Sequence, residues 1–388
     1  MQGNALKVLL LQDTLNYAGT ESHVLSLAQH LNALPETMAT IATPRQSQTM
    51  SRAHALNVPT VALQRFPGPV NVLAVMQVTL ALLSRRYDVL HAHNGRTSLV
   101  VALACILAGR GKCVVTQHFL TPDHITKSGW SAAILRNTHR WISRHIHHRI
   151  CVSQAVLAAM IARSDAECLD SVTVVHNGID VKKLAGHTLQ VNMKSVRDAL
   201  DVPVDALIIL CAARLEPEKS ISVLIDAMVS VVATFPDAVC IIAGDGSLRP
   251  VLQAQINSSG LSRGVKLIGF HQEIADLMAV SAVFVLPAEA EPFGLVLTEA
   301  MASSLPVIAC GVGGPIEIVS HGVTGFLVEP RDSAMLADVI NRLLGDASLR
   351  LQMAKASLER VNAMFTAAEM ARKTKAVYIM ATAGRGTR

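Results

Sequence analysis

The chain has 388 residues, of which 51% are hydrophobic and 16% are charged, and its mean hydropathy is +0.39. This length is more than one hydrophobic core usually organises, so we expect two globular domains, and the composition excludes a disordered or collagen-like chain. Only 3% of the residues are aromatic and no basic stripe is interleaved with stacking side chains, which argues against nucleic-acid binding.

The positive charge lies in the first half of the chain. Residues 1–190 hold 17 Lys and Arg against 9 Asp and Glu, a net charge of +8, whereas the remainder holds 17 against 20, a net charge of −3. Thirteen of the 15 histidines also precede residue 190. The asymmetry indicates an anionic partner for the first half: a phosphorylated substrate, a membrane surface or, with the least support, nucleic acid.

The N-terminal segment lacks the basic start, long apolar core and cleavage site of a signal peptide. The longest uncharged run, 66–84, contains Pro67 and Pro69 and is short for a membrane span, so we expect a buried amphipathic helix there. The seven cysteines are scattered and form no C-x-x-C pair, which is typical of reduced core residues. We therefore expect a cytoplasmic protein, either soluble or peripheral at the inner face of the membrane.

Short β-branched apolar runs alternate with stretches of helical period, a pattern typical of βαβ units around parallel sheets. In the first half the pattern predicts strands at 6–12, 38–42, 58–63, 88–92, 112–117, 149–152 and 172–175, and helices at 20–33, 70–85, 96–108, 129–145 and 154–163. In the second half it predicts strands at 206–212, 238–243, 265–268, 282–286, 306–309 and 325–328, followed by helices at 332–344, 347–363 and 366–382.

Between the two halves, residues 176–205 lose this alternation and gain polar residues, which places the domain boundary there. We predict an α/β protein with two Rossmann-like, doubly wound domains. The first spans 1–184 and is joined by the C-terminal helix, about 366–388, and the second spans 185–365. The carboxyl ends of both sheets are expected to face a central cleft.

The first candidate motif is the turn after the first strand, where Gly19 precedes a predicted helix. A glycine in such a turn lets backbone N–H groups approach a phosphate. The G-x-G-x-x-G pattern of dinucleotide sites is absent, which argues against a nicotinamide or flavin cofactor. A plain tight turn, with Thr20 capping the helix, explains the residues equally well.

The second motif, ARLEPEK at 213–219, follows the first strand of the second domain. Arg214 leaves the strand and Lys219 enters the next element, so both cations can converge on a diphosphate. The alternative is a surface cluster of ion pairs with Glu216 and Glu218.

The third motif follows the strand AVFVL and reads EAEPFGLVLTEAMA. It places Glu291 at the end of the strand and Glu299 inside the following helix, with the free N–H groups near Gly294 facing the same space. Carboxylates in this position accept hydrogen bonds from hydroxyl-rich groups such as ribose. A capped surface helix with ordinary glutamates is the weaker explanation.

Together with AGDG at 243–246, HNGID at 176–180, VSQA at 152–155 and the segment 311–330, these motifs resemble the nucleotide-sugar glycosyltransferases of family 4. The resemblance runs from about Lys7 to the last helix and implies the two-domain B-type glycosyltransferase fold (GT-B). It also implies a retaining sugar transfer from a nucleotide-diphosphate donor, a UDP-sugar or GDP-sugar, without a metal or other cofactor.

The resemblance assigns roles to residues of the second domain. It implies that Arg214 and Lys219 contact the donor diphosphate and that Glu299 contacts the ribose hydroxyls. It assigns the sugar hydroxyls to Glu291, Phe293, Gly294 and Leu295, and the loop bordering the base to Gly269, Phe270 and His271.

In the first domain, the resemblance implies that the N–H of Gly19 reaches the diphosphate and that His118 lies beside the donor sugar. His118 could instead be an ordinary polar residue at a strand end. Ala18 and Ala213 stand where the family usually has glycine.

Electrostatics alone make this chemistry plausible, because breaking a sugar–diphosphate bond creates an anionic leaving group. No D-x-D triplet is present to hold Mg²⁺ or Mn²⁺, so Arg214 and Lys219 are expected to replace the metal. We expect the acceptor to be a cell-envelope polysaccharide or glycolipid. A sugar-nucleotide epimerase and a glycosyltransferase with a small soluble acceptor are the alternatives.

Residues 134–149 form the last candidate site. Arg136, Arg140 and Arg144 are spaced four residues apart, beside Trp141 and several isoleucines. A basic amphipathic helix of this kind is typical of a segment that lies on an anionic lipid surface. The alternative is that its apolar side packs on the first sheet while the arginines are solvated.

Overall fold

A computed structural model describes residues 5–64, 71–120, 137–138, 140–163 and 171–383. The chain divides into two compact units, one made of Met1–Gly178 with Ala367–Arg388 and the other of Ile179–Thr366. At the junction, Ile179 forms a β-bridge with Thr366 and donates its N–H to the carbonyl oxygen of Phe365 at 2.9 Å. The second unit therefore begins at residue 179, whereas the predicted boundary is residue 185.

The first unit is built on a seven-stranded parallel sheet with the order β3-β2-β1-β4-β5-β6-β7. Its strands are β1 (Leu6–Leu11), β2 (Thr37–Thr43), β3 (Thr60–Ala62), β4 (Val89–Ala92), β5 (Lys112–Gln117), β6 (His148–Cys151) and β7 (Val172–Val174). Each strand overlaps a predicted one, because strands buried on both faces are short, continuous apolar runs. The strand order reverses between β1 and β4.

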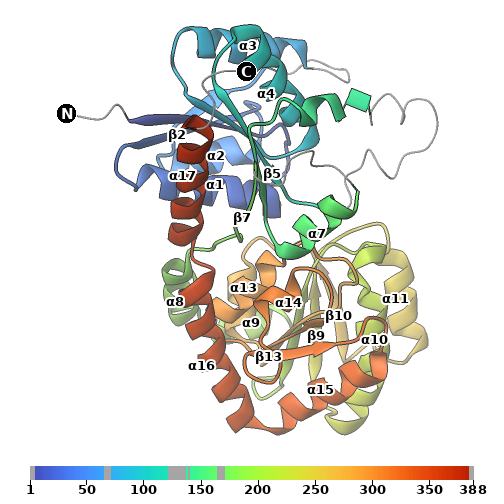
Figure 1. Ribbon diagram of the computed structural model, residues 1–388. Coiled ribbons are helices and arrows are strands. Elements are labelled where there is room, and N and C mark those ends of the chain that lie inside the picture. The colour runs from blue at the N-terminus through green and yellow to red at the C-terminus, as the bar shows by residue number, and fades with distance from the viewer. Residues whose placement is uncertain (1–4, 65–70, 121–136, 139, 164–170, 384–388) are drawn as a thin grey trace. The chain divides into compact units, whose positions relative to one another are not determined.

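Helices cover both faces of this sheet. Val8 and Leu10 of β1 pack with α1 (Gly19–Asn32) and α17 (Ala367–Ala383), while Leu9 and Leu11 pack with α3 (Val72–Leu83) and α4 (Gly95–Ala108). Alternate residues of a strand point to opposite faces, so one strand serves both cores. Figure 1 shows α17 in red beside the blue α1, so the C-terminal helix belongs to the first unit. The helices α2 (Gln48–Ala55) and α7 (Gln154–Ala162) complete this description.

Two sequence expectations for the first unit need correction. Helix α2 was not predicted, because its segment QTMSRAHA is short and mostly polar. The basic helix predicted at 134–149 does not extend that far: its described part is helical at 137–138 and 140–143, and Arg144 lies in a turn before β6 begins at His148. Arg136 lies outside the described residues.

The second unit has a six-stranded parallel sheet with the order β10-β9-β8-β11-β12-β13. Its strands, all of which match predicted segments, are β8 (Ile208–Ala212), β9 (Val239–Ala243), β10 (Val265–Gly269), β11 (Val283–Leu286), β12 (Val307–Cys310) and β13 (Gly325–Val328). The order reverses between β8 and β11. Such a reversal opens a crevice at the carboxyl ends of the two strands, where α/β proteins bind ligands.

The helices of the second unit are α8 (Val181–Gln190), α9 (Met193–Ala199), α10 (Ile221–Thr234), α11 (Arg249–Ser258), α12 (Ile274–Ala279), α13 (Leu295–Ala302), α14 (Pro315–Ile318), α15 (Ser333–Gly345) and α16 (Ala347–Met364). The largest core cluster lies between the sheet and α10, α11 and α15. Helices α8 and α9 occupy the polar segment 176–205, where the sequence loses its alternation of strands and helices, and they bury little.

Helix α3 is only partly the buried amphipathic helix that the sequence predicts. Ala74, Val75, Val78 and Leu82 are buried, but the outer face is also apolar. Its exposed side chains are between 43% and 63% accessible: Val72, Leu73, Met76, Leu80 and Leu83. Across the described residues, no helix is both long enough and apolar enough to cross a membrane. The six described cysteines are buried and free, as predicted.

Candidate active site

The predicted donor residues of the second unit gather at the carboxyl edge of its sheet. Arg214 and Lys219 follow β8, and Glu291 to Leu295 follow β11. These two strands flank the reversal in strand order, so the crevice there carries both cations and carboxylates. The sequence motifs were separated by more than 70 residues, and the sheet order brings them together.

In the loop after β8, Arg214 forms one of the surface ion pairs considered as the alternative for this motif, whereas Glu216 does not. The Nη2 of Arg214 contacts Oε1 of Glu218 at 2.6 Å, and the arginine side chain remains 67% exposed. This is an exposed ion pair of small energetic value, so Arg214 can turn toward an anionic ligand at low cost. Glu216 instead accepts hydrogen bonds from the backbone N–H and hydroxyl of Ser247, at 3.0 and 2.7 Å.

Lys219 has a different partner. Its Nζ lies 2.7 Å from Oε2 of Glu291, and both side chains are only 14% exposed. The pair joins the two loops at the reversal and compensates the burial of both charges. Removing either partner would leave a poorly solvated charge, which is expensive.

The loop after β11 is held by close backbone contacts. The N–H of Gly314 donates to the carbonyl oxygen of Glu291 at 2.9 Å. Gly313 has a φ of +66°, and a Cβ there would lie 2.3 Å from that same oxygen. Only glycine fits in this position, which explains why GVGG follows β12. A glycine is also required in the loop after β9, because a Cβ on Gly244 would lie 1.9 Å from the carbonyl oxygen of Ala213.

Glu289 anchors the same loop to its surroundings. It accepts hydrogen bonds from Arg331 at 2.8 Å and from the hydroxyl of Ser220 at 2.7 Å. The bond from Arg331, and to a smaller extent that from Ser220, lowers the pKa of Glu289 below its ordinary value. The backbone N–H of Glu289 also donates to the carbonyl oxygen of Glu218, so the loops after β8 and β11 are connected directly.

Helix α13 begins where this loop ends. Gly294 is its N-cap, and no side chain caps the helix. Among the described residues, no side chain therefore occupies the first backbone N–H groups of the helix, and such groups favour an anion. Phe293 is buried and packs edge-on against Phe365, with ring centroids 5.9 Å apart, which fixes the entry to the helix.

Glu299 lies on α13 and differs from the other carboxylates. No hydrogen bond or ion pair of its side chain is present among the described residues. Burial raises its pKa to about 7, because desolvation disfavours the charged form and no cation compensates it. Because the Glu299 carboxyl has no protein partner among the described residues, its oxygens can accept hydrogen bonds from the hydroxyl groups of a ligand.

The predicted base-side loop lies at the same edge of the sheet, after β10. Gly269 is the last residue of that strand, and Phe270, which follows it, is 74% exposed. His271 is partly exposed. Because β9 lies between β10 and β8, the exposed Phe270 ring is one strand removed from the loop that carries Arg214 and Lys219.

In the first unit, Gly19 is the first residue of α1, after the N-cap Ala18. The carboxylate of Glu21 accepts the backbone N–H of Ala18 at 3.0 Å, so Glu21 rather than Thr20 caps the helix. The Nδ2 of Asn94, the N-cap residue of α4, donates a hydrogen bond to Oδ1 of Asp13 after β1, at 2.9 Å. The two loops at the reversal between β1 and β4 are therefore connected.

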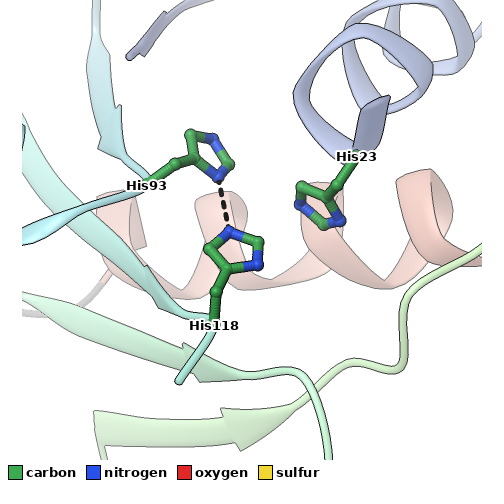
Figure 2. Close-up of side chains that lie close together, drawn as sticks. All are labelled: His23, His93 and His118. Carbon is green, nitrogen blue, oxygen red and sulfur yellow. Dashed lines mark hydrogen bonds between the residues drawn. The ribbon is translucent and has the colours of Figure 1, made fainter. Parts of the chain in front are cut away.

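His118 follows β5 and is part of a group of histidines that the sequence did not reveal. Its Nε2 lies 3.3 Å from Nδ1 of His93, which follows β4, and His23 of α1 faces both rings (Figure 2). The ring centroid of His23 is 4.8 Å from that of His118 and 5.3 Å from that of His93. The segment HAHN at the end of β4, together with the excess of histidine in the first half, was the available signal.

His91 supports this group from inside the sheet. Its Nδ1 is 2.7 Å from the hydroxyl of Tyr378 on α17, and its Nε2 is 2.7 Å from Oγ1 of Thr116. Burial lowers the pKa of His91, His93 and His118 well below the ordinary value and that of His23 to about 4. The side chain of Asn177, beside His23, partly opposes the shift there. All four rings are therefore neutral near pH 7.

Residues 137–138 and 140–149 are the described part of the predicted membrane segment. They agree in part with the alternative, in which the apolar side packs on the first unit and the arginines are solvated. Ile142 is buried against α4 residues, whereas Arg140 and Arg144 are exposed and Trp141 is 40% exposed. One side of this segment thus packs on the unit and the basic side faces outward.

Comparisons with known proteins agree with this geometry. Residues 17–183 match the family model described as Glycosyltransferase Family 4, and residues 192–360 match the model described as Glycosyl transferases group 1. The chain is 30% identical to the glycogen synthase of Mycobacterium tuberculosis over 78% of this chain and 70% of that protein. It is 29% identical to the phosphatidyl-myo-inositol mannosyltransferase of Mycobacterium leprae over 88% of each.

Among solved structures, the chain is similar to Anabaena Alr3699/HepE in complex with UDP-glucose. The TM-score is 0.81 and the identity is 26%, over 97% of this chain and 100% of that chain. Two parallel-sheet α/β units, the motif-bearing edges and these matches lead to one assignment. The chain belongs to the family 4 and group 1 glycosyltransferases, enzymes with the GT-B fold.

Proposed function

We propose that this glycosyltransferase moves a sugar from a UDP-sugar to a polysaccharide or lipid-linked acceptor with retention of configuration. The observation that carries the proposal is the ion pair of Lys219 with Glu291, which connects the loops after β8 and β11 where the strand order of the second sheet reverses. Arg214 lies in the first of these loops, and Glu299 lies on α13, the helix that follows the second. The similarity to a protein solved with UDP-glucose supports the donor class, and GDP-sugars are the second candidate.

In the proposed reaction, the bond between the anomeric carbon and the diphosphate oxygen breaks and the electron pair leaves with the diphosphate. Arg214, Lys219 and the N-terminus of α13 stabilise the negative charge that develops there. The acceptor hydroxyl attacks from the face that the diphosphate leaves, and its proton passes to a diphosphate oxygen. This route requires no covalent intermediate on the protein.

These ion pairs belong to the free enzyme, and donor binding is proposed to break the exposed pair of Arg214 with Glu218. Lys219 sits between the two loops, so it can contact a diphosphate while it keeps Glu291 in place. Glu291 and the backbone of Phe293, Gly294 and Leu295 are proposed to hold the sugar hydroxyls. Glu299, with its raised pKa and no protein partner among the described residues, is proposed to accept hydrogen bonds from ribose.

For the first unit, we propose that His118 donates or accepts a hydrogen bond with the donor sugar as a neutral ring, and that Gly19 offers its N–H to the diphosphate. Residues 269–271 are proposed to border the base. The exposed ring of Phe270 supports that role, because a flat apolar face suits a nucleobase.

We further propose that catalysis needs no metal or other cofactor, because Arg214 and Lys219 can supply the positive charge that a divalent ion would otherwise bring. The absence of a D-x-D triplet from the sequence supports this proposal.

The acceptor is proposed to lie at an anionic membrane surface, which would make the enzyme a peripheral protein of the cytoplasmic face. Exposed Arg140 and Arg144 beside Trp141 support this proposal. The apolar outer face of α3, which ends at the exposed Arg85 and Arg86, adds a second surface of the same chemistry. The similarity to a mannosyltransferase whose name contains phosphatidyl-myo-inositol agrees with a lipid-linked acceptor.

Turnover with UDP-sugars tests the proposed site. Arg214→Ala and Lys219→Ala should each reduce turnover by about 10² to 10³, since each removes a charge that stabilises the leaving group. Lys355→Ala is the matched control, because Lys355 is an 81% exposed lysine of the same unit with a weak partner. Thermal melting of each variant separates lost chemistry from lost folding. Wild-type turnover in both site variants would overturn the assignment.

The product distinguishes the alternatives. A sugar-nucleotide epimerase would release free nucleotide or an altered sugar without any acceptor, whereas the proposed transferase needs an acceptor for rapid turnover. A panel of UDP- and GDP-sugars with lipid-linked and soluble acceptors therefore tests donor and acceptor together, and the anomeric configuration of the product tests retention.

A further inference from the structure

The histidines at the carboxyl edge of the first sheet form an arrangement that sugar transfer does not require. His23, His93 and His118 come from α1 and from the ends of β4 and β5, and their ligand nitrogens all lie within 4.8 Å of one another. Figure 2 shows the three rings turned toward a common space. We propose that His23, His93 and His118 bind a transition-metal ion of the Zn²⁺ class.

The distance between two of the three rings fits such an ion. Zn–N bonds of 2.0–2.1 Å in tetrahedral geometry separate two ligand nitrogens by about 3.3 Å. The observed separation between Nδ1 of His93 and Nε2 of His118 is 3.3 Å. The ligand nitrogens of the three rings lie within 4.8 Å of one another, so the His23 ring must move closer to the other two to complete a three-histidine site with an open fourth position.

Unsatisfied polar atoms support the proposal independently. Both ring nitrogens of His23 are buried without a hydrogen-bond partner. His23 is only 4% exposed, so this arrangement is costly as it stands. A metal ion would use the lone pair of His23 that has no other partner.

The surroundings supply the supporting contacts that ligating histidines usually have. The side chain of Asn177 lies close enough to His23 to oppose the lowering of its pKa, but its buried Oδ1 is outside hydrogen-bond geometry. It can therefore accept the N–H on the far side of a metal-bound His23 ring once that ring moves. His91 is not a ligand, since Tyr378 and Thr116 occupy its nitrogens. Its ring centroid is 4.2 Å from that of His93, which fixes the orientation of that ligand.

Metal binding to the three histidines leaves the number of protons on the protein unchanged. A neutral imidazole has one protonated ring nitrogen and one with a lone pair, so each ring must offer the second kind of nitrogen to the metal. The proton shared between His93 and His118 moves to the outer nitrogen of the ring that carries it. Imidazole ligands suit Zn²⁺, Cu²⁺ and Ni²⁺, whereas Mg²⁺ and Mn²⁺ prefer oxygen.

One consequence rests on the proposed function. His118 is proposed to contact the donor sugar, so an ion that takes its nitrogen would remove that contact. Zn²⁺ would then inhibit turnover, while a chelator would leave turnover unchanged or raise it. Binding itself does not depend on this role, so it can fail or succeed separately.

Binding is tested on the full chain, stripped with a chelator, by titration with Co²⁺ and by calorimetry with Zn²⁺. We expect one equivalent of Co²⁺ to give the visible absorption of a tetrahedral site, and Zn²⁺ to displace it. His23→Gln should weaken binding at least tenfold while the fold is kept, and His93→Gln should do the same. His54→Gln is the control, because His54 is an exposed histidine of the same unit on α2.

The outcomes separate the two proposals. Absence of stoichiometric binding to the wild type, or equal binding by His23→Gln and wild type, would overturn the metal site. Stoichiometric binding that His23→Gln loses supports it, whether or not turnover is detected. Stoichiometric Zn²⁺ binding without inhibition would leave the site in place and contradict the proposed role of His118.

Discussion

Replacing Glu299 by glutamine should stabilise the free enzyme, and by more at high pH than at low pH. Desolvation raises the pKa of Glu299 to about 7 from an ordinary value of 4.5. The folded state therefore favours the protonated carboxyl, and this contribution to stability is fully present below pH 4.5 and lost as the pH rises through 7. Glutamine stays neutral, so it avoids the cost of a buried charge.

The size of the effect follows from the shift. At 1.36 kcal/mol per pH unit, the linkage relation gives a cost of about 1 kcal/mol at pH 5 and about 3 kcal/mol at pH 8. The side chain keeps some contact with solvent, which screens the charge, so these values are upper bounds. For a unit of this size, 1 kcal/mol corresponds to about 2–4 °C in melting temperature. The gap between variant and wild type should thus widen by up to about 8 °C from pH 5 to pH 8.

Calorimetric melting of both proteins across this pH range measures the gap. Glu359→Gln is the control, since Glu359 is a 67% exposed glutamate of the same unit. The same reasoning predicts that UDP binding releases about half a proton at pH 7, because ribose hydroxyls stabilise the ionised carboxyl. A gap that is equal at pH 5 and pH 8 would refute the desolvation argument, and unchanged donor affinity in Glu299→Gln would refute the ribose contact.

Three further predictions concern the loops, the metal and the membrane. Gly313→Ala should lower the melting temperature and turnover more than Gly322→Ala, since both glycines have positive φ but a Cβ meets the Glu291 carbonyl oxygen at 2.3 Å only in the first case; equal losses would contradict the close-approach argument. Turnover should survive EDTA, and a loss that Mg²⁺ or Mn²⁺ restores would show that Arg214 and Lys219 do not replace a metal. Binding to anionic vesicles should weaken as salt rises and in the triple variant Arg136→Glu, Arg140→Glu, Arg144→Glu. Leu80→Glu should also weaken binding, because it places a negative charge on the apolar outer face of α3. If all variants co-sediment with vesicles as the wild type does, neither surface binds the membrane.

Much of the fold could be predicted from local sequence. Strands such as β8 and β11 are short apolar runs, and the helices between them carry a different period, so both kinds of element can be recognised without tertiary information. The motifs at strand ends indicated where Arg214 and Glu291 would lie, because the carboxyl ends of parallel strands share one edge of the sheet. Helix α2 escaped recognition, since its short, polar sequence lacks a clear apolar face.

Only the tertiary structure decided which side chains meet. The contact between Lys219 and Glu291 depends on β8 and β11 being neighbours, which no local pattern encodes. The same is true of His23, His93 and His118, whose elements converge through the order of the first sheet. Burial is also a tertiary property: it raises the pKa of Glu299 and keeps the histidine rings neutral by excluding water around them. The sequence thus determined the elements and the family, while strand order and desolvation determined the chemistry available at their edges.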